Sequence, residues 1–510
     1  MTLAPPDRRA RPRGQVDHSA VRATPRTVAL YCVIGVAFVL LATGNAAGYR
    51  YGVSDQAFYV PGVIRALEPA AFPRDAALID AQGRLMLTDE LIAGIVRASG
   101  VSLERLFLVA YLMSLALTWA ALVAIGARLY TSTWGTIALT AAFTLRHRIP
   151  RTSANSFEPY FHPRMLAFAI CLLAIAGVQR RKYTVAIVLV GVSALVHITT
   201  ALWFSILIGV ALAILEPRLR RLAIAIAVAG LAVAAWAFTI GPLRTRMDDV
   251  WLQAVASKDS LFASQWPAWA WIANFAMLGG LWWAHARRRA RGQASAEDAA
   301  LVWGATALVG FFVVTLPLVA AHVAFPVQLQ ISRVFWIVDV LATIYALSLV
   351  RRESVARVVA FTLLLVSLAR AAYVMGVERS ERELFALHLP DSPWTDAMHW
   401  LATEPLGAHV LADPGHSWKY GSSVRVAARR DVLLEDVKDS AIAIYSRDVA
   451  ARVVEREAAI GDFSTLTADR AQQLAERYDL NYLVTEAPLP LPIAYENERF
   501  HIYRLKAIDR

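Results

Sequence analysis

Cysteine is almost absent from this chain. Only Cys32 and Cys171 occur among 510 residues, and both stand inside apolar segments. A disulfide framework that would stabilise an exported domain is therefore excluded. Charged residues are also scarce, at 18% of the sequence, whereas hydrophobic residues make up 57%. This balance excludes an ordinary water-soluble protein and indicates a polytopic α-helical membrane protein.

Strong local signatures of chemistry are missing as well. The sequence has no phosphate-binding loop, no glycine-rich dinucleotide fingerprint, no zinc-ligand pair and no nucleophile elbow. It also has no internal repeat, although many transporters are built from repeated halves. An active site in this chain must therefore be assembled from separate loops.

Long apolar segments are what the chain does have. Eight of them approach the roughly 20 residues that a membrane-spanning helix needs, and three are shorter. The eight lie near 27–47, 103–127, 162–179, 222–240, 267–286, 298–316, 333–350 and 355–375. The three shorter segments lie near 132–146, 183–197 and 199–215.

The distribution of arginines predicts how these segments are oriented. The net charge of +11 comes largely from arginines at the ends of apolar segments, as cytoplasmic loops require, so we do not expect nucleic acid as a partner. Residues 183–215 have basic flanks at both ends, which predicts two short helices that turn back near 197–200. Counting this hairpin gives about 11 transmembrane or re-entrant helices, with the N-terminus inside and the C-terminus outside. Segment 132–146 is expected to cross only partly or to lie in the protein interior.

Composition divides the chain into three regions. Residues 1–26, rich in arginine and proline, predict a disordered cytoplasmic tail. Residues 27–376 form the predicted transmembrane domain, whose first outer loop is 48–102. Residues 377–510 predict a periplasmic α/β domain with partly parallel strands. Its expected helices lie at 394–403, 446–459 and 467–478, and its expected strands at 408–412, 481–485 and 500–505.

Acidic residues gather in the first outer loop, and Asp55 follows the first apolar segment most closely. A carboxylate at a dry membrane boundary can act as a general base toward a hydroxyl or amine, or can hold a divalent cation. Asp55 is therefore the candidate catalytic residue, and Asp75 is a weaker candidate. The competing interpretation is that these loop acids are simply solvated.

A second group of candidates lies between residues 146 and 164, where arginines face outward against the orientation rule. Guanidinium groups bind phosphate or pyrophosphate through paired, charge-assisted hydrogen bonds. Glu158 and His162 stand four residues apart at the expected start of a helix and could share a metal ion or a proton. Pairing with the outer acids, or contact with anionic lipid headgroups, is the alternative. The candidate phosphate-binding residues here are Arg146, Arg148, Arg151 and Arg164.

A third group begins at Arg333, which opens an apolar helix that carries Asp339 about two turns deeper. Ionisable groups at membrane depth are costly and often functional. Asp339 does not share a helical face with Arg333, so its partner must come from another helix, and a structural ion pair is the alternative. His197 and His322 are weaker candidates, since a lone histidine near a helix end is usually a packing residue.

The order of these features resembles the C-type superfold of membrane glycosyltransferases. The shared features are an apolar anchor, a long outer loop with an early acid, a short helix pair, about eleven helices and an outer α/β domain. Three segments of the tail are similar to outer domains of uncharacterised bacterial multi-pass proteins in that superfold. They are WLATEPLGAHVLADPGH (400–416), SVRVAARRDVLLEDVK (423–438) and NYLVTEAPLPLPIAYENERFHIYRL (481–505).

The resemblance implies an enzyme of the bacterial inner membrane that takes sugar from a polyprenyl-phosphate-linked donor on the periplasmic face. By position, Asp55 matches the family's catalytic base and Arg333 resembles the arginine that many members place against the donor phosphate. Gln56 stands where a second acid often occurs, so a divalent metal ion remains open. Expected partners are the lipid-linked donor and membrane lipids. The alternatives are a transporter or flippase for an anionic lipid or solute, and a non-catalytic member that binds an envelope partner.

Overall fold

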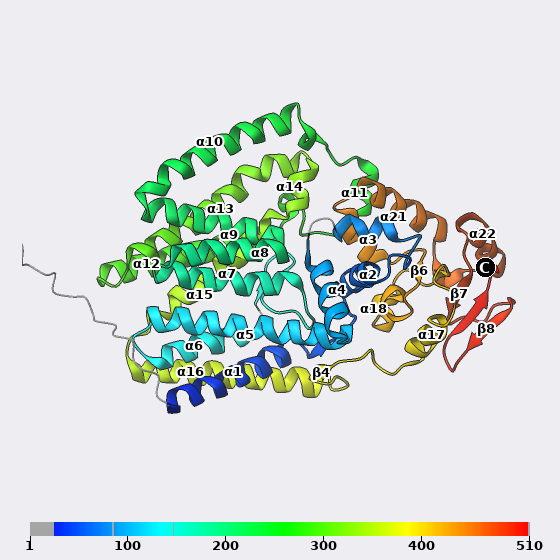
Figure 1. Ribbon diagram of the computed structural model, residues 1–510, viewed down its shortest axis with the longest axis horizontal. Helices are drawn as coiled ribbons and strands as arrows, with labels where there is room; N and C mark the ends of the chain where they lie inside the picture. The colour runs from blue at the N-terminus through cyan, green and yellow to red at the C-terminus, as the bar shows by residue number, and fades with distance from the viewer. Residues whose placement is uncertain (1–24, 84–85, 146, 508–510) are drawn as a thin grey trace, which may run out of the picture.

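A computed structural model describes residues 25–83, 86–145 and 147–507. The molecule has two parts that lie end to end, a bundle of long helices and a smaller part that contains a β-sheet (Figure 1). The predicted tail lies outside the described residues, apart from Pro25 and Arg26, which open helix α1 (Pro25–Asn45). The chain is thus a mainly helical protein with a C-terminal sheet region, as the sequence indicated.

Each apolar segment found in the sequence forms a helix. Among the described residues, six helical segments are long and apolar enough to cross a membrane, so several crossings are supported and the predicted total of eleven stays a prediction. The six are α5 (Leu103–Leu129), α9 (Ile198–Leu215), α10 (Pro217–Thr239), α13 (Ala296–Ala320), Ala324–Leu347 and Glu353–Glu378.

The bundle is completed by shorter or more polar helices. Two of the six segments are interrupted, because Ala324–Leu347 contains α14 and α15, and Glu353–Glu378 contains α16 and a terminal π-helical turn. The bounds are α6 (Thr133–Thr144), α7 (Pro163–Gln179), α8 (Tyr183–Val196), α12 (Ala268–Ala290), α14 (Ala324–Leu329), α15 (Val334–Leu347) and α16 (Glu353–Tyr373).

Helix α6 lies in the interior of the bundle, as predicted for the short segment near 132–146. It is buried along nearly its whole length and packs against α5 and α16. Small residues permit this approach, since a Cβ on Gly126 of α5 would lie 2.8 Å from Thr136. By contrast, α10 buries only Ala237, and Figure 1 shows it along one edge of the bundle.

Helices α8 and α9 meet at His197, which confirms the predicted break. His197 ends α8 in an extended conformation (φ −156°, ψ 100°), and its side chain accepts a hydrogen bond from the backbone N–H of Thr200 at the start of α9. A histidine thus caps the second helix as serine or aspartate would. Since the two helices pack against each other, the chain turns back here.

The C-terminal part contains a five-stranded sheet with the strand order β6-β5-β7-β9-β8. The neighbours of β5 are parallel to it, whereas β9 is antiparallel to both of its neighbours, which confirms the partly parallel pairing. The sequence missed β6 and β8. The strands are β5 (His409–Leu411), β6 (Asp431–Val432), β7 (Tyr482–Thr485), β8 (Ile493–Glu496) and β9 (His501–Arg504).

Six helices accompany this sheet, and three of them confirm the predicted helices of the tail. Trp394 at the start of the first helix anchors one hydrophobic core under the sheet, together with Val410 and Ile502 from two strands. The helices are α17 (Pro393–Leu401), α18 (His416–Tyr420), α19 (Val424–Ala427), α20 (Asp436–Ala443), α21 (Arg447–Ile460) and α22 (Ala468–Tyr478).

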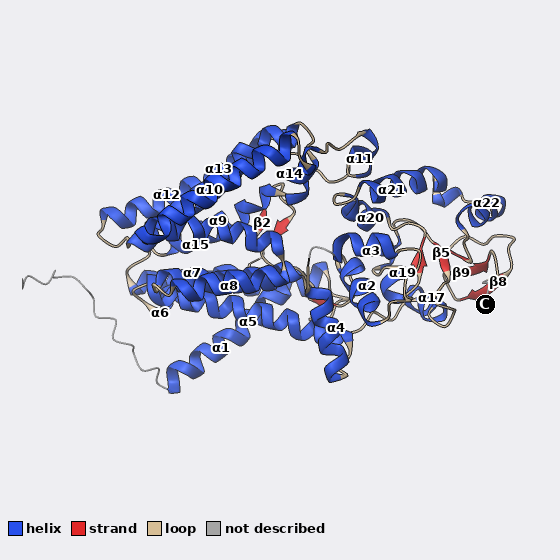
Figure 2. Ribbon diagram, turned by 45° about the horizontal axis from the view of Figure 1, so that its top comes forward, coloured by secondary structure: helices blue, strands red, loops and turns tan. Residues whose placement is uncertain are grey.

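The first loop lies between the helical bundle and the C-terminal sheet (Figures 1 and 2). Two of its helices, α2 and α3, pack against α19 and α20 respectively, and β1 pairs in parallel with β4. The remaining elements are α2 (Gln56–Leu67), α3 (Ala76–Gly83), α4 (Thr88–Ser99), α11 (Asp249–Ala254), β1 (Tyr49–Arg50), β2 (Arg148–Ile149), β3 (Ala154–Asn155) and β4 (Phe385–Ala386).

Close packing of α9 and α13 depends on Gly304, because a Cβ there would lie 2.4 Å from the carbonyl oxygen of Leu207. We expect Gly304→Ala to destabilise the protein by about 1–3 kcal/mol, since the helices must part. The matched control is Gly310→Ala in the same helix, where a Cβ meets open space. Thermal unfolding in detergent measures both variants, and equal melting temperatures would contradict this packing.

Candidate functional site

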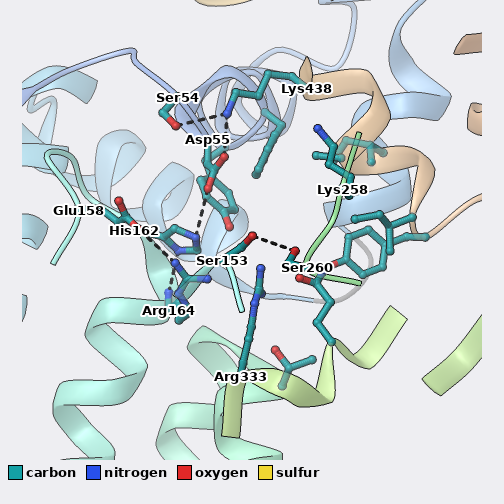
Figure 3. A pocket seen from close by; sticks show the side chains of 18 of the residues that line it. Ser54, Asp55, Ser153, Glu158, His162, Arg164, Lys258, Ser260, Arg333 and Lys438 are labelled. Atoms are coloured by element: carbon teal, nitrogen blue, oxygen red, sulfur yellow. Dashed lines mark hydrogen bonds and ion pairs between the residues drawn. The ribbon is translucent and has the colours of Figure 1, made fainter. Parts of the chain in front are cut away.

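A cavity of about 470 Å³ lies where the helical bundle meets the C-terminal part. Its walls come from the start of α2, the loop before α7, the junction of α8 and α9, the segment after α11, the start of α15, and α20 (Figure 3). Segments distant in the sequence therefore converge on one space. The predicted site residues that line it are Asp55, Glu158, His162, Arg164, His197 and Arg333.

Asp55 occupies the N-cap position of α2 but makes no side-chain bond to that helix. Its carboxylate faces the cavity instead. Oδ1 accepts a hydrogen bond from Lys438 Nζ at 2.8 Å, and Oδ2 accepts one from the Tyr160 hydroxyl at 3.2 Å. Burial alone would raise the pKa of Asp55, but the charge and hydrogen bond of Lys438 outweigh it and hold the pKa well below its usual range. Asp55 is therefore ionised at neutral pH.

His162 presents a neutral ring to Asp55. It caps α7, and its Nδ1 accepts a hydrogen bond from the backbone N–H of Arg164 at 3.1 Å. Burial, together with the charge of Arg164, lowers the pKa of His162 well below its usual value. Because Nδ1 is an acceptor, the single proton of the neutral ring sits on Nε2, which lies 3.6 Å from Asp55 Oδ2.

Two guanidinium groups face the cavity from the side of the bundle. Arg164 is buried, and its Nη2 lies 3.4 Å from Oε1 of Glu158. Its guanidinium group lies over the ring of Trp336. Arg333 stands at the start of α15, and among the described residues its side chain makes no ion pair, while its Nε is buried without a hydrogen-bond partner. A cation left in this state favours an anionic ligand.

A narrow apolar pocket of about 10 Å³ adjoins these two arginines. It shares Arg164 and Arg333 with the cavity and continues between α7, α9 and α15. Its walls are aromatic, with Phe168 stacked on Trp336 at a centroid distance of 3.7 Å and Trp203 nearby. The arginines thus stand where a polar cavity meets an apolar, aromatic one.

Two lysines line the same cavity, and the sequence analysis missed both. Lys438 of α20 donates to Asp55 and lies 3.3 Å from Ser54 Oγ. Lys258, from the segment after α11, donates to the carbonyl oxygen of Val437 at 2.9 Å. Burial and the positive charge of Lys438 lower the pKa of Lys258. The lining therefore holds four basic side chains but only two acidic ones, Asp55 and Glu158.

Lysine is rare in this chain, but its rarity alone would not have found these two residues. Two of the five lysines face the cavity, in a sequence whose other basic residues are arginines. The five are Lys182, Lys258, Lys419, Lys438 and Lys506.

Several described candidates from the sequence lie away from the cavity, whereas Arg146 falls outside the described residues. Arg148 is exposed on β2. Arg151 forms an ion pair with Asp259, as expected if the outward arginines pair with outer acids. The ring of His322 packs against Phe262, with ring centroids 5.4 Å apart.

Asp339 has a partner from another part of the chain, as its position required. His147 Nδ1 lies 2.8 Å from Asp339 Oδ2, and the second ring nitrogen of His147 faces the carbonyl oxygen of Ala142. Both side chains of the pair are only 18% exposed. The pair joins the loop after α6 to α15 and does not line the cavity.

The cavity does not suit a divalent metal ion. Among the described residues, no three histidine, cysteine or acidic side chains gather as metal ligands would. Glu158 faces Arg164 rather than His162, and Oδ1 of Asp55 is already bound by an ammonium group. Four basic side chains would also repel a divalent cation. The residues fit an anion instead.

Comparison with known proteins gives no relative from which a role could be transferred, since neither a protein-family model nor a curated protein sequence matches this chain. The site must therefore be interpreted from its own geometry.

Asp75 proves to be a buried ion-pair residue in the interface between the first loop and the C-terminal part. Its Oδ2 lies 2.7 Å from Nε of Arg425, and Arg452 binds the other oxygen. Arg425 is 1% exposed and also forms a two-point contact with Asp439, at 2.6 and 3.0 Å. Burial opposes ionisation of Asp75, but the two arginines hold its pKa below the usual range.

We expect Arg425→Met to destabilise the C-terminal part by about 3–5 kcal/mol, because it leaves buried carboxylates without their partner. The matched control is Arg477→Met, which removes an exposed pair with Glu455 and should cost less than about 1 kcal/mol. Urea unfolding of the purified protein measures both. Similar unfolding midpoints for the two variants would show that the buried cluster does not hold this interface.

Proposed function

We propose that the chain is a membrane glycosyltransferase that takes sugar from a polyprenyl-phosphate-linked donor at this cavity. The observation that carries the proposal is the convergence of Asp55 with Arg164 and Arg333 beside an aromatic pocket. The donor has an anionic phosphodiester head and an apolar chain. The cavity has room for the head, and the aromatic side chains beside the arginines mark where the chain would enter once the space between them widens from about 10 Å³.

The arginines would hold the phosphate of the donor. Arg333 offers guanidinium donors that no described side chain accepts, and the second arginine, Arg164, lies at the same junction. Planar guanidinium groups bind phosphate oxygens in pairs, and in a partly dry cavity this attraction is stronger than in water. The apolar chain would enter beside Phe168, Trp203 and Trp336, whose side chains would move apart to admit it and would shield it from water.

Asp55 would serve as the base. As the acceptor oxygen bonds to the anomeric carbon, the bond from that carbon to the phosphate oxygen breaks, and its electron pair leaves on the phosphate. The acceptor's proton passes to Asp55. A carboxylate with a lowered pKa is a weak base, so it would take the proton late, when the new C–O bond is largely formed. The arginines would stabilise the charge that develops on the leaving phosphate.

The orientation belongs to the same proposal. Basic residues gather at helix ends distant from the cavity, among them Arg128, Arg181 and Arg288. By the positive-inside rule these ends would be cytoplasmic, so the cavity and the C-terminal part would face the periplasm of a bacterial inner membrane. The N-terminus would be inside and the chain would cross in eleven transmembrane or re-entrant helices.

Binding of the donor head is tested with Arg333→Gln in the purified, reconstituted protein. We expect at least a tenfold loss of affinity for a polyprenyl phosphate, about 1.4 kcal/mol or more, since hydrogen bonds to charged groups contribute about 1.5–3 kcal/mol. Arg148→Gln is the matched control, because Arg148 is exposed outside the cavity. Equal affinities in the two variants would remove the arginine site from the proposal.

Transfer itself is tested with Asp55→Asn. We expect this variant to bind the lipid phosphate but to lose transfer of labelled sugar by at least about a hundredfold, the low end for a positioned acid–base group. Full transfer activity in Asp55→Asn would rule out Asp55 as the base. Movement of the intact lipid across the membrane without release of sugar would instead favour a flippase.

A further inference from the structure

The cavity has two cationic ends. Arg164 and Arg333 line the aromatic pocket, whereas Lys258 and Lys438 do not. Figure 3 shows Asp55 with Lys438 on one side and the arginines on the other. The lysines come from the C-terminal part and the segment packed against it, while the arginines come from the ends of bundle helices.

Within the part of the chain that the structure describes, only one of the two lysines at this end has an ion-pair partner. Lys438 has Asp55 as its partner, but among the described residues Lys258 makes no ion pair and bonds only the carbonyl oxygen of Val437. The carboxylates of Asp436 and Asp55 act on Lys258 from a distance, but neither is within ion-pair range. Two ammonium groups held close together repel each other, and an anion between them relieves that repulsion.

Hydroxyl groups add hydrogen bonds at this end. Ser260 is buried, and its hydroxyl lies 2.8 Å from that of Ser153, both on the cavity wall beside Lys258 (Figure 3). Ser54 Oγ lies beside Lys438. Ammonium and hydroxyl donors together suit a carboxylate or a phosphate better than a neutral group.

We infer that Lys258 and Lys438 form a second anion subsite that binds a carboxylate or phosphate group carried by the acceptor. The inference rests on the proposed function, in which the arginines hold the donor phosphate. Asp55 then stands between the two anions, next to the acceptor group that Lys438 positions. The enzyme would in this way select an acidic acceptor over a neutral one.

The test uses the full chain in nanodiscs, with farnesyl phosphate as the lipid-phosphate probe. Glucuronate and glucose 6-phosphate probe the acceptor subsite as carboxylate and phosphate, and glucose is the neutral control. With farnesyl phosphate saturating, we expect one of the two anionic sugars to bind at one equivalent by calorimetry, while glucose does not bind. The sugar that binds identifies the anionic group.

Lys258→Gln should weaken binding of the anionic sugar about tenfold or more and leave the affinity for farnesyl phosphate unchanged. Lys258→Arg should largely restore it. Lys419→Gln is the matched control, since that lysine pairs with Asp413 away from the cavity lining. If only Lys258→Gln weakens sugar binding, the effect comes from the lost cation in the cavity and not from a general loss of positive charge.

Two results would overturn the second subsite. Displacement of farnesyl phosphate by the anionic sugar would mean that one site binds both anions, and unchanged sugar binding in Lys258→Gln would mean that the lysine takes no part. If neither anionic sugar binds while farnesyl phosphate binds, this inference alone is contradicted. Failure of farnesyl phosphate to bind would contradict the proposed function instead.

Discussion

The buried ion pair between Asp75 and Arg425 is the contact on which the candidate site depends. It joins the first loop to the C-terminal part with both side chains almost fully removed from solvent. Asp55 lies on the loop side of this interface and Lys438 on the other, so their own contact across the cavity follows from it. Because an ion pair is directional, the pair between Asp75 and Arg425 fixes how the first loop sits against the C-terminal part, and so fixes the side chains that line the cavity from either side.

Charge is arranged very differently in the buried interface and in the cavity. In the interface, the buried carboxylates of Asp75 and Asp439 each meet Arg425 in close geometry, which makes these pairs structural. In the cavity, Arg333 and Lys258 have no carboxylate partner among the described residues. Leaving cations uncompensated costs stability, and the chain tolerates that cost at the place where three of its regions meet. Binding of an anionic ligand would supply the partner that these two cations lack.

Much of the fold could be predicted because membrane helices and alternating strands depend on local composition. The break at His197 followed from charge at both ends of residues 183–215, and β5, β7 and β9 followed from their apolar runs. Strand β6 was missed because two residues are too few for a pattern, and β8 because it is only half buried and follows a proline-rich stretch.

The site was predictable only where a polar residue stood out against an apolar background. Asp55, His162, Arg164 and Arg333 did so, and they converge. Arg151 and the weaker candidate Asp75 were also named, but they are paired with Asp259 and Arg425, which no local pattern reveals. The two cavity lysines lie in polar segments where a basic residue is ordinary, so their position depends on how the C-terminal part docks.

The central claim is that a lipid phosphate binds with its head in the cavity and its chain in the adjoining aromatic pocket. Photo-cross-linking tests this most directly, with a farnesyl phosphate that carries a diazirine on its chain and mass spectrometry of the labelled peptides. The account predicts labelling of α7, α9 and α15 around Phe168, Trp203 and Trp336, suppressed by excess farnesyl phosphate. Labelling confined to the exposed helix α10, or labelling that excess farnesyl phosphate does not suppress, would contradict it.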